Sequence, residues 1–352
     1  MFATILVLSV AGCERTPSSD TQPVDQPAPA TQPAPPVEDE VIVYTALDRQ
    51  FSEPILAEFT KRTGIAARAV YDTESTKTVG LVNRIIAEAN RPRCDVFWNN
   101  EILNTLRIKT EGLLQPCRPS RGAAYPEQYR DPDGYWYGFA ARARVLIVNT
   151  ELVKPDELPT SIRDLADPRW KGRAGIAKPL FGTTASHVAC LFALLGEEPA
   201  RALLESFKEN DVRVVAGNKT CAEMVANGQL AFGLTDTDDA LIELEAGKPV
   251  RIVFPDGDPD AMGTPLLPNT LAMIKDAPHP VAAEKLIDYL LSPEVEARLA
   301  RGPSGQIPLH PKTAEQSRAA SLDSIHQMKI DFAVAAENFK KAAAYIESEF
   351  LE

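Results

Sequence analysis

The alternation of apolar and polar positions from residue 41 onward predicts short strands separated by amphipathic helices. Residues 41–44 (VIVY) form a β-branched apolar run typical of a buried strand. Residues 51–63 place their apolar side chains on one face of a helix, and Gly64 is suited to end that helix. This first strand and helix predict a unit in which a sheet is covered by a helix.

The same alternation continues through most of the chain. Further strands are expected at residues 66–71, 95–98, 145–148, 174–176, 212–215, 230–234, 251–254 and 270–274. Further helices are expected at residues 79–89, 184–195, 221–227, 280–291 and 293–301. A tail from about residue 314 to 350 is also helical in pattern. Such β-α-β alternation predicts a mainly parallel sheet with helices on its faces.

The chain is long enough for two hydrophobic cores. The chain has 352 residues, and about 310 of them follow the first forty. A segment of that length is usually too long for a single hydrophobic core. We therefore expect an α/β fold of two lobes with a ligand cleft between them. The expected first lobe comprises residues 41–140 with part of 240–312, the second comprises 141–240, and residues 313–352 form a helical tail.

A short apolar run at the N-terminus predicts an export signal. Residues 2–12 (FATILVLSVAG) are too few to span a bilayer, which needs about 20 apolar residues. The run ends in small residues before Cys13, and residues 10–13 (VAGC) resemble a lipobox, in which the cysteine receives a lipid. Residues 14–40 are rich in Pro, Ala, Thr and Gln, which is typical of a disordered tether. The alternative is a chance apolar run followed by a buried cysteine.

The net charge and the cysteine spacing exclude several classes of binding partner and of metal site. A net charge of −12 argues against a nucleic-acid or anionic-membrane surface, although one local pocket can still bind an anion. No cysteine lies in a C-x-x-C pair or at zinc-site spacing. Without Cys13, the four remaining cysteines allow three disulfide pairings, among them Cys94–Cys117 with Cys190–Cys221. Whether any of these bridges forms is left open.

Catalytic motifs are absent from the sequence. It contains no G-x-S-x-G, H-E-x-x-H, P-loop or dinucleotide fingerprint. The four histidines, His187, His279, His310 and His326, are scattered, and only His187 is near a segment that we consider as a site. The sequence therefore predicts a binding protein and not an enzyme.

Three segments at expected helix starts carry polar side chains suited to a ligand. Residues 181–186 (FGTTAS) combine free N–H groups with hydroxyls, which suits an anion. Residues 72–77 (DTESTK) offer Thr73 and Ser75, and residues 235–239 (TDTDD) offer two adjacent carboxylates. Helix capping explains each segment equally simply. Trp98 either lines the cleft or fills the core.

Several strings, in order from residue 41 to 312, resemble the periplasmic ferric-ion-binding receptors of ABC importers. They are residues 43–46 (VYTA), 58–65 (EFTKRTGI), 95–97 (DVF), 111–116 (EGLLQP), 131–136 (DPDGYW), 142–145 (RARV), 165–173 (LADPRWKGR), 225–228 (VANG) and 308–311 (PLHP). The resemblance implies a two-domain Venus-flytrap fold that closes on its ligand by hinge motion. It also implies an ABC permease and its ATPase as partners, a monomeric receptor, and a location outside the cytoplasmic membrane.

The resemblance also implies where a metal would bind, and there this chain departs from the family. Asp238 and Asp239 occupy the positions of the family's two iron-binding tyrosines, Asp48 that of its histidine, and Glu101 that of its acidic residue. Carboxylate oxygens suit hard ions, so this set is able to bind Fe³⁺, Ca²⁺, Mn²⁺ or the ammonium groups of an organic cation. The resemblance implies a synergistic anion, phosphate or carbonate, at Gly182, Thr183, Thr184 and Asn218. Thr45, Thr73 and Ser75 are further candidates for binding an anion or another ligand atom.

Three functions are left open by the sequence. The first is capture of ferric iron for an importer. The second is a receptor for an organic solute such as a phosphonate, sugar phosphate or polyamine, in which Arg142 and Arg144 take an anion and Asp238 and Asp239 take an amine. The third is a lipoprotein adaptor that has lost its ligand.

Overall fold

The computed structural model describes Gly12, residues 38–72 and residues 79–352. Cys13, Thr73 and Ser75 lie outside these residues, so their expected roles stay predictions. The chain from Glu38 to Glu352 forms one compact unit. Within the described part of the chain, no helix combines the length and the apolarity that crossing a bilayer requires.

The first half of the sheet is mixed parallel and antiparallel. Strand β1 (Glu40–Thr45) lies between β2 (Ala66–Tyr71) and β3 (Val96–Asn99) and is parallel to both. Strand β10 (Leu266–Ile274) then pairs antiparallel with β3 and with the short β4 (Leu114–Gln115). This half carries α1 (Arg49–Thr63), α2 (Val79–Ala87), α3 (Leu103–Thr110), α8 (Pro280–Leu290) and α9 (Pro293–Arg301).

Both faces of this half are buried, because successive strand residues point to opposite sides. Val43 and Trp98 belong to a core shared with α1, α8 and α9. Tyr44 and Phe97 belong to a second core shared with α2 and α3. Trp98 is therefore a core residue with no exposed surface. At the end of α1, Gly64 has a φ of 76° and its N–H donates to Thr60 O, the left-handed cap that the sequence predicted.

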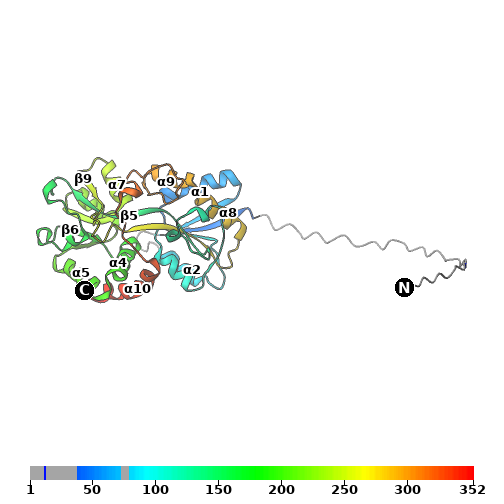
Figure 1. Ribbon diagram of the computed structural model, residues 1–352, viewed down its shortest axis with the longest axis horizontal. Coiled ribbons are helices and arrows are strands. Elements are labelled where there is room, and N and C mark those ends of the chain that lie inside the picture. Colours follow the sequence, from blue (N-terminus) through cyan, green and yellow to red (C-terminus); the bar gives the residue numbers. More distant parts are fainter. Residues whose placement is uncertain (1–11, 13–37, 73–78) are drawn as a thin grey trace, which may run out of the picture. The chain divides into compact units, whose positions relative to one another are not determined.

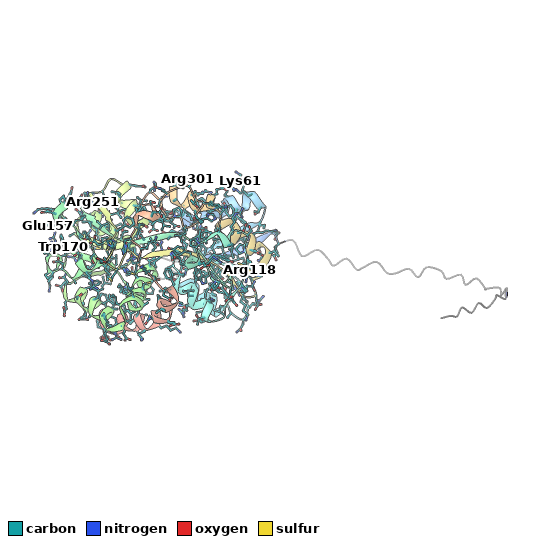
Figure 2. All side chains as sticks on the ribbon, viewed as in Figure 1. Lys61, Arg118, Glu157, Trp170, Arg251 and Arg301 are labelled. Carbon is teal, nitrogen blue, oxygen red and sulfur yellow. The ribbon has the colours of Figure 1, made fainter. Side chains whose placement is uncertain are left out.

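The second half has the order β5-β8-β6-β7, with β9 on the other edge of β5. Its elements are β5 (Tyr137–Asn149), β6 (Ala174–Ala177), β7 (Arg213–Val215), β8 (Phe232–Asp236), β9 (Val250–Val253), α4 (Gly182–Leu195), α5 (Glu197–Glu209), α6 (Asn218–Ala226) and α7 (Thr237–Glu245). Trp170, labelled in Figure 2, packs edge-on against Phe232 of β8 with ring centroids 5.5 Å apart.

Strand β5 runs through both halves and connects them (Figure 1). It pairs with β10 up to Ala143, which faces Leu266, and with β8 from Arg144, which faces Asp236. Near the crossing, Ala140 has a φ of 42°, beside a register shift in the pairing with β10. The two arginines of β5 therefore lie where the sheet changes from one half to the other.

The expected α/β class is confirmed. The expectation of a mainly parallel sheet was wrong, because β5 and β10 pair antiparallel with their neighbours and make the sheet mixed. Most predicted strands and helices are present within a few residues of their expected bounds. Strand β5 is longer than the predicted residues 145–148, and α3 and α5 were not predicted. The prediction of a continuous helical tail was wrong, because helix appears only from Phe332. Residues before it have irregular backbone with a single 3₁₀ turn, Leu322–Ser324.

The C-terminal helix α10 (Phe332–Tyr345) packs mainly against α4, and also against α3 of the first half. A π turn, Ile346–Phe350, follows it, and Ile346 has no exposed surface. Lys341 and Arg201 form ion pairs with Glu197 and Glu349, so α5 also holds the tail. The described cysteines at 94, 117, 190 and 221 are buried free thiols, and none of them forms a disulfide with another.

Candidate ligand-binding site

A small cavity of about 30 Å³ lies where the two halves of the sheet meet. It is lined by Asp48, Asn100, Arg142, Gly182, Thr183, Asn218, Asp236, Asp238 and Asp239. Asn100 directly follows β3 and Asp236 ends β8, so the cavity lies at the carboxyl ends of strands, where open α/β sheets bind ligands. A cavity of this size holds about two waters, or an ion with a water.

Asp236 is held by two buried arginines at the back of the cavity. Arg144 Nη1 donates to Asp236 Oδ1 over 2.7 Å, and Arg142 Nη1 donates to Oδ2 over 3.1 Å. Burial alone would raise the pKa of Asp236, but Arg142 and Arg144 outweigh it and lower the pKa below its ordinary value. Asp236 is therefore an ionised group that is already committed to protein partners.

The start of α4 and the start of α6 complete the hydrogen bonding around Asp236. Thr183 Oγ1 donates to Asp236 Oδ2 over 2.6 Å, and Asn218 Nδ2 donates to the same oxygen over 3.1 Å. Arg144 also donates to Thr183, Thr184 and Asn218. Of the expected anion-binding residues, Gly182, Thr183 and Asn218 line the cavity, whereas Thr184 lies behind it.

Asp238 and Asp239 lie in the first turn of α7 and face the cavity. The helix dipole stabilises carboxylates in a first helical turn. The same placement of Asp238 and Asp239 therefore fits both a stabilising role at the start of α7 and a role in binding a ligand. One carboxylate oxygen from each of Asp236, Asp238 and Asp239 lies within 4.8 Å of the other two. This spacing is suited to a cation, and the arrangement brings together two of the four residues expected to bind metal.

Asp48 joins this site from the first half of the sheet. It is the N-cap residue of α1 and lines the cavity opposite the α7 carboxylates. Thr45 lies near it at the end of β1 but is fully buried, and its hydroxyl accepts a hydrogen bond from Leu47 N over 3.2 Å. Thr45 therefore shapes the loop that presents Asp48 and does not line the cavity.

Glu101 is placed differently from the other expected metal ligands. It is fully buried, and its carboxylate accepts hydrogen bonds from Leu103 N (2.7 Å) and Asn104 N (3.1 Å) at the start of α3. Ser186 Oγ of α4 donates to it over 2.7 Å. Glu101 thus caps α3 and connects it to the second half, and it is not among the residues that line the cavity.

Three lining residues were not among the metal-binding or anion-binding positions expected from the family resemblance: Asn100, Arg142 and Asp236. Asp236 stands in the same short acidic segment as Asp238, and its place as the last residue of β8 was the signal that could have identified it. Arg142 was considered only as an anion ligand. Its contact with Asp236 depends on the pairing of β5 with β8, which no local pattern reveals.

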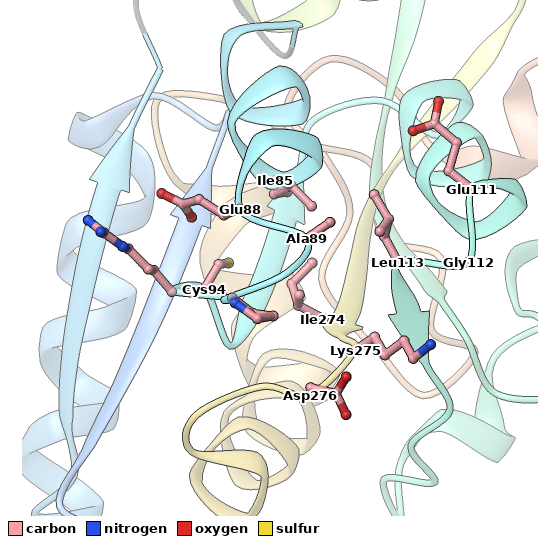
Figure 3. A pocket seen from close by; sticks show the side chains of 12 residues that line it. Ile85, Glu88, Ala89, Cys94, Glu111, Gly112, Leu113, Ile274, Lys275 and Asp276 are labelled. Atoms are coloured by element: carbon pink, nitrogen blue, oxygen red, sulfur yellow. The ribbon is translucent and has the colours of Figure 1, made fainter.

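A larger pocket of about 220 Å³ lies at the opposite end of the first half (Figure 3). Cys94, Leu113 and Ile274 line it, at the amino-terminal end of β3 and the carboxyl end of the antiparallel β10. Burial raises the pKa of the Cys94 thiol, so that thiol is not a reactive group. The small cavity at the other end of β3 is therefore the better candidate site.

Comparisons with known proteins agree with this fold. Iron uptake protein A1 of Synechocystis sp. is 32% identical over 277 residues, which cover 76% of this chain and 75% of that protein. Iron-bound HitA of Pseudomonas aeruginosa matches with a TM-score of 0.77 at 24% identity, over 87% of this chain and 99% of that one. AfuA of Actinobacillus pleuropneumoniae, solved with fructose-6-phosphate, has a TM-score of 0.77 at 22% identity, over 89% and 99% of the two chains.

The family model for bacterial extracellular solute-binding proteins matches residues 104–334. This span contains β5, β8 and the starts of α4, α6 and α7, whereas Asp48 at the start of α1 lies before it. The resemblance noted in the sequence is confirmed at the level of the family. The chain belongs to the bacterial extracellular solute-binding protein family.

Proposed function

We propose that this protein is the extracytoplasmic receptor of an ABC importer for ferric iron and has no catalytic activity of its own. It captures the ion in the small cavity, closes on it and presents it to a permease and its ATPase. The observation that carries this proposal is the cluster of Asp236, Asp238 and Asp239 oxygens within 4.8 Å of one another beside a cavity of ionic size.

The charge of the site favours a cation. Four carboxylates, Asp48 and the three aspartates of residues 236–239, stand against two guanidinium groups, which leaves a net charge of −2. Oxygen ligands of this kind suit hard ions such as Fe³⁺. We expect Asp48, Asp238 and Asp239, which line the cavity, to contact the ion, whereas Asp236 is held by two arginines. We also propose that a small anion binds with the ion, at Gly182 and Thr183.

Iron as the cargo is supported by relatives whose names state iron uptake. The Synechocystis protein is one of them, and the structure of HitA contains iron. By the sequence resemblance, Asp238 and Asp239 stand at the positions of the family's tyrosine pair, so the coordination that we propose is by carboxylates.

An organic solute is the second candidate function. The fold of AfuA, which was solved with a sugar phosphate, supports it. In this chain, however, Arg142 and Arg144 already donate to Asp236, and the excess of carboxylates repels a phosphate unless a cation is bound beside it. An amine such as a polyamine would suit the charge better than a phosphonate or a sugar phosphate.

We test the ligand by thermal unfolding of the chelator-stripped protein with ferric citrate, with and without phosphate, and with Ca²⁺ and Mn²⁺ as controls. A ligand present at 100 times its Kd adds about 2.7 kcal/mol, roughly a few degrees in Tm. The double variant Asp238→Asn, Asp239→Asn is expected to lose the Fe³⁺ response. The exposed pair Asp258→Asn, Asp260→Asn makes the same change in net charge away from the cavity and should keep the response.

The two candidate functions predict different outcomes in this assay. A shift specific to Fe³⁺ supports the iron receptor, and a larger shift with phosphate supports the anion at Gly182 and Thr183. Stabilisation only by a polyamine, phosphonate or sugar phosphate would replace iron by an organic cargo. An equal Fe³⁺ response in the Asp238/Asp239 variant would refute the site assignment.

Attachment to the membrane through a lipid on Cys13, and a monomeric state, are further parts of the proposal. The anchor is supported by the sequence of residues 10–13 alone. Metabolic labelling with a radioactive fatty acid should mark the wild-type protein but not Cys13→Ser, and label in both would refute the anchor. Light scattering of the purified protein tests the monomer.

A further inference from the structure

Arg142 contacts both halves of the protein from its position on the crossing strand. Its Nη2 donates to Asn100 O in the first half over 2.7 Å, and its Nη1 donates to Asp236 (3.1 Å) and Asp238 (3.3 Å) in the second. The side chain is only 5% exposed. A single guanidinium group therefore joins the two walls of the cavity and neutralises carboxylates on one of them.

The neighbouring arginine has a different set of partners. Arg144 has no exposed surface and bonds Asp236, Thr183, Thr184 and Asn218, which all belong to the second half. Opening of the halves would leave these bonds of Arg144 intact but would break the bond of Arg142 to Asn100. Arg142 is thus the more readily displaced of the two cations.

We propose that Arg142 is an internal counter-ion for the cargo site: it neutralises Asp238 while the cavity is empty, and a bound cation displaces it. The inference rests on the proposed cation cargo and adds a residue that sets the affinity. Asp238 is almost buried, and a buried carboxylate requires a partner charge whether or not cargo is present. A cation that binds the aspartate cluster then takes over Asp238 and encounters the positive charge of Arg142.

Arg142 cannot yield by losing its proton. Burial alone would lower its pKa, but the nearby carboxylates of Asp238 and Asp236 outweigh burial and raise it. The guanidinium therefore stays charged at every physiological pH. Displacement must occur by movement of the side chain, and its return to Asp238 would promote release of the cargo to the permease.

The test compares the affinities of wild-type protein, Arg142→Gln and Arg142→Lys for Fe³⁺, measured by competition with citrate at constant pH and ionic strength. Removing one positive charge beside a cation site should tighten binding by about tenfold or more in Arg142→Gln. Arg142→Lys keeps the charge and should stay within about threefold of wild type. Dissociation should be slower in Arg142→Gln, because the competing charge is gone.

A second measurement on the wild-type protein covers the case in which Arg142→Gln does not fold. The buried arginine N–H signals are followed by NMR with Ga³⁺, a diamagnetic ion of similar charge and size to Fe³⁺. We expect the Arg142 signals to shift and to exchange faster on binding, with those of Arg144 unchanged. Arg142 signals that do not change at saturating Ga³⁺ would overturn the proposal.

The outcomes separate this inference from the proposed function. Binding of Fe³⁺ by wild type and Arg142→Gln with equal Kd, or weaker binding by the folded variant, overturns the counter-ion role and leaves the receptor function standing. Absence of Fe³⁺ binding in both proteins overturns the cation cargo and the counter-ion role together. Tighter binding in Arg142→Gln but not in Arg142→Lys supports both.

Discussion

Arg144 and Asp236 face each other across the β5–β8 pair, and Arg144 Nη1 lies 2.7 Å from Asp236 Oδ1. Both side chains are essentially inaccessible to water. Strand β5 continues into the other half of the sheet. The Arg144–Asp236 pair therefore fixes the position of the cavity relative to the point on β5 where the two halves of the sheet meet. The pair therefore has a structural role that is separate from the role proposed for Arg142.

Replacing Arg144 should destabilise the protein strongly. In Arg144→Met, Asp236 keeps Arg142 but loses its shortest ion pair, and breaking a buried pair costs about 3–5 kcal/mol. Urea denaturation followed by circular dichroism measures the loss. Arg251→Met, at an exposed position on β9 labelled in Figure 2, is the control and should leave the midpoint almost unchanged. A loss below about 1 kcal/mol in Arg144→Met would contradict a structural role for the pair.

Substitutions of Glu101 and Asp48 should have different effects, one on the stability of the fold and the other on the affinity for Fe³⁺. In Glu101→Gln the start of α3 loses a charged hydrogen-bond acceptor, and we expect a loss of about 1–3 kcal/mol in stability with little change in Fe³⁺ affinity. In Asp48→Asn the cavity loses a carboxylate, so affinity should fall about tenfold or more while stability changes little. Denaturation and citrate competition on both variants test this. An equal loss of affinity in Glu101→Gln would make Glu101 a ligand after all.

His187 should make the protein less stable as the pH falls. Burial, and then the charge of Arg144, lower its pKa to about 3, whereas an unfolded histidine titrates near 6.5. Between these values only the unfolded state binds the proton, so stability falls with decreasing pH by about 1.4 kcal/mol per pH unit. Denaturation at pH 7.5 and 4.5 should show that His187→Gln removes about 2–3 kcal/mol of this difference. The same pH dependence in wild type and variant would refute it.

His279 provides a control of opposite sign. Burial alone would lower its pKa, but the hydrogen bond to Asp95 Oδ2 and the charges of Asp95, Glu40 and Glu38 together outweigh burial and raise it. A raised pKa contributes stability that is present at low pH and is lost as the pH rises through the folded value. His279→Gln should therefore weaken the protein more at pH 4.5 than at pH 7.5. A larger effect at pH 7.5 would contradict the raised pKa.

The C-terminal tail should be part of the fold that carries the site. Ile346 has no exposed surface, and truncation of a fully buried isoleucine costs about 2–5 kcal/mol. We expect this loss in Ile346→Ala, measured by urea denaturation. Val334 of α10 is 38% exposed, and Val334→Ala should change stability by less than about 1 kcal/mol. Equal effects of the two substitutions would show that the tail is not docked in solution.

Local patterns predicted most elements of the fold because strand and helix periods are properties of neighbouring residues. The alternation in residues 41–71 predicted β1, α1 and β2 with nearly their observed bounds. The first part of β5 was missed because its alanines and arginines do not look like a buried strand. Those arginines are buried only because Asp236 and Asp238 reach them from another part of the chain.

The fold class, the family and the acidic segment at residues 235–239 were evident from the amino-acid sequence alone. They follow from local periodicity and from motifs that are contiguous in the chain. Which carboxylates share a cavity became evident only from the tertiary structure. Its packing placed Asp48 beside Asp238 and Asp239, turned Glu101 away to cap α3, and set two arginines behind Asp236. Contacts between residues distant in the sequence depend on how strands cross and pair, and no local pattern contains that information.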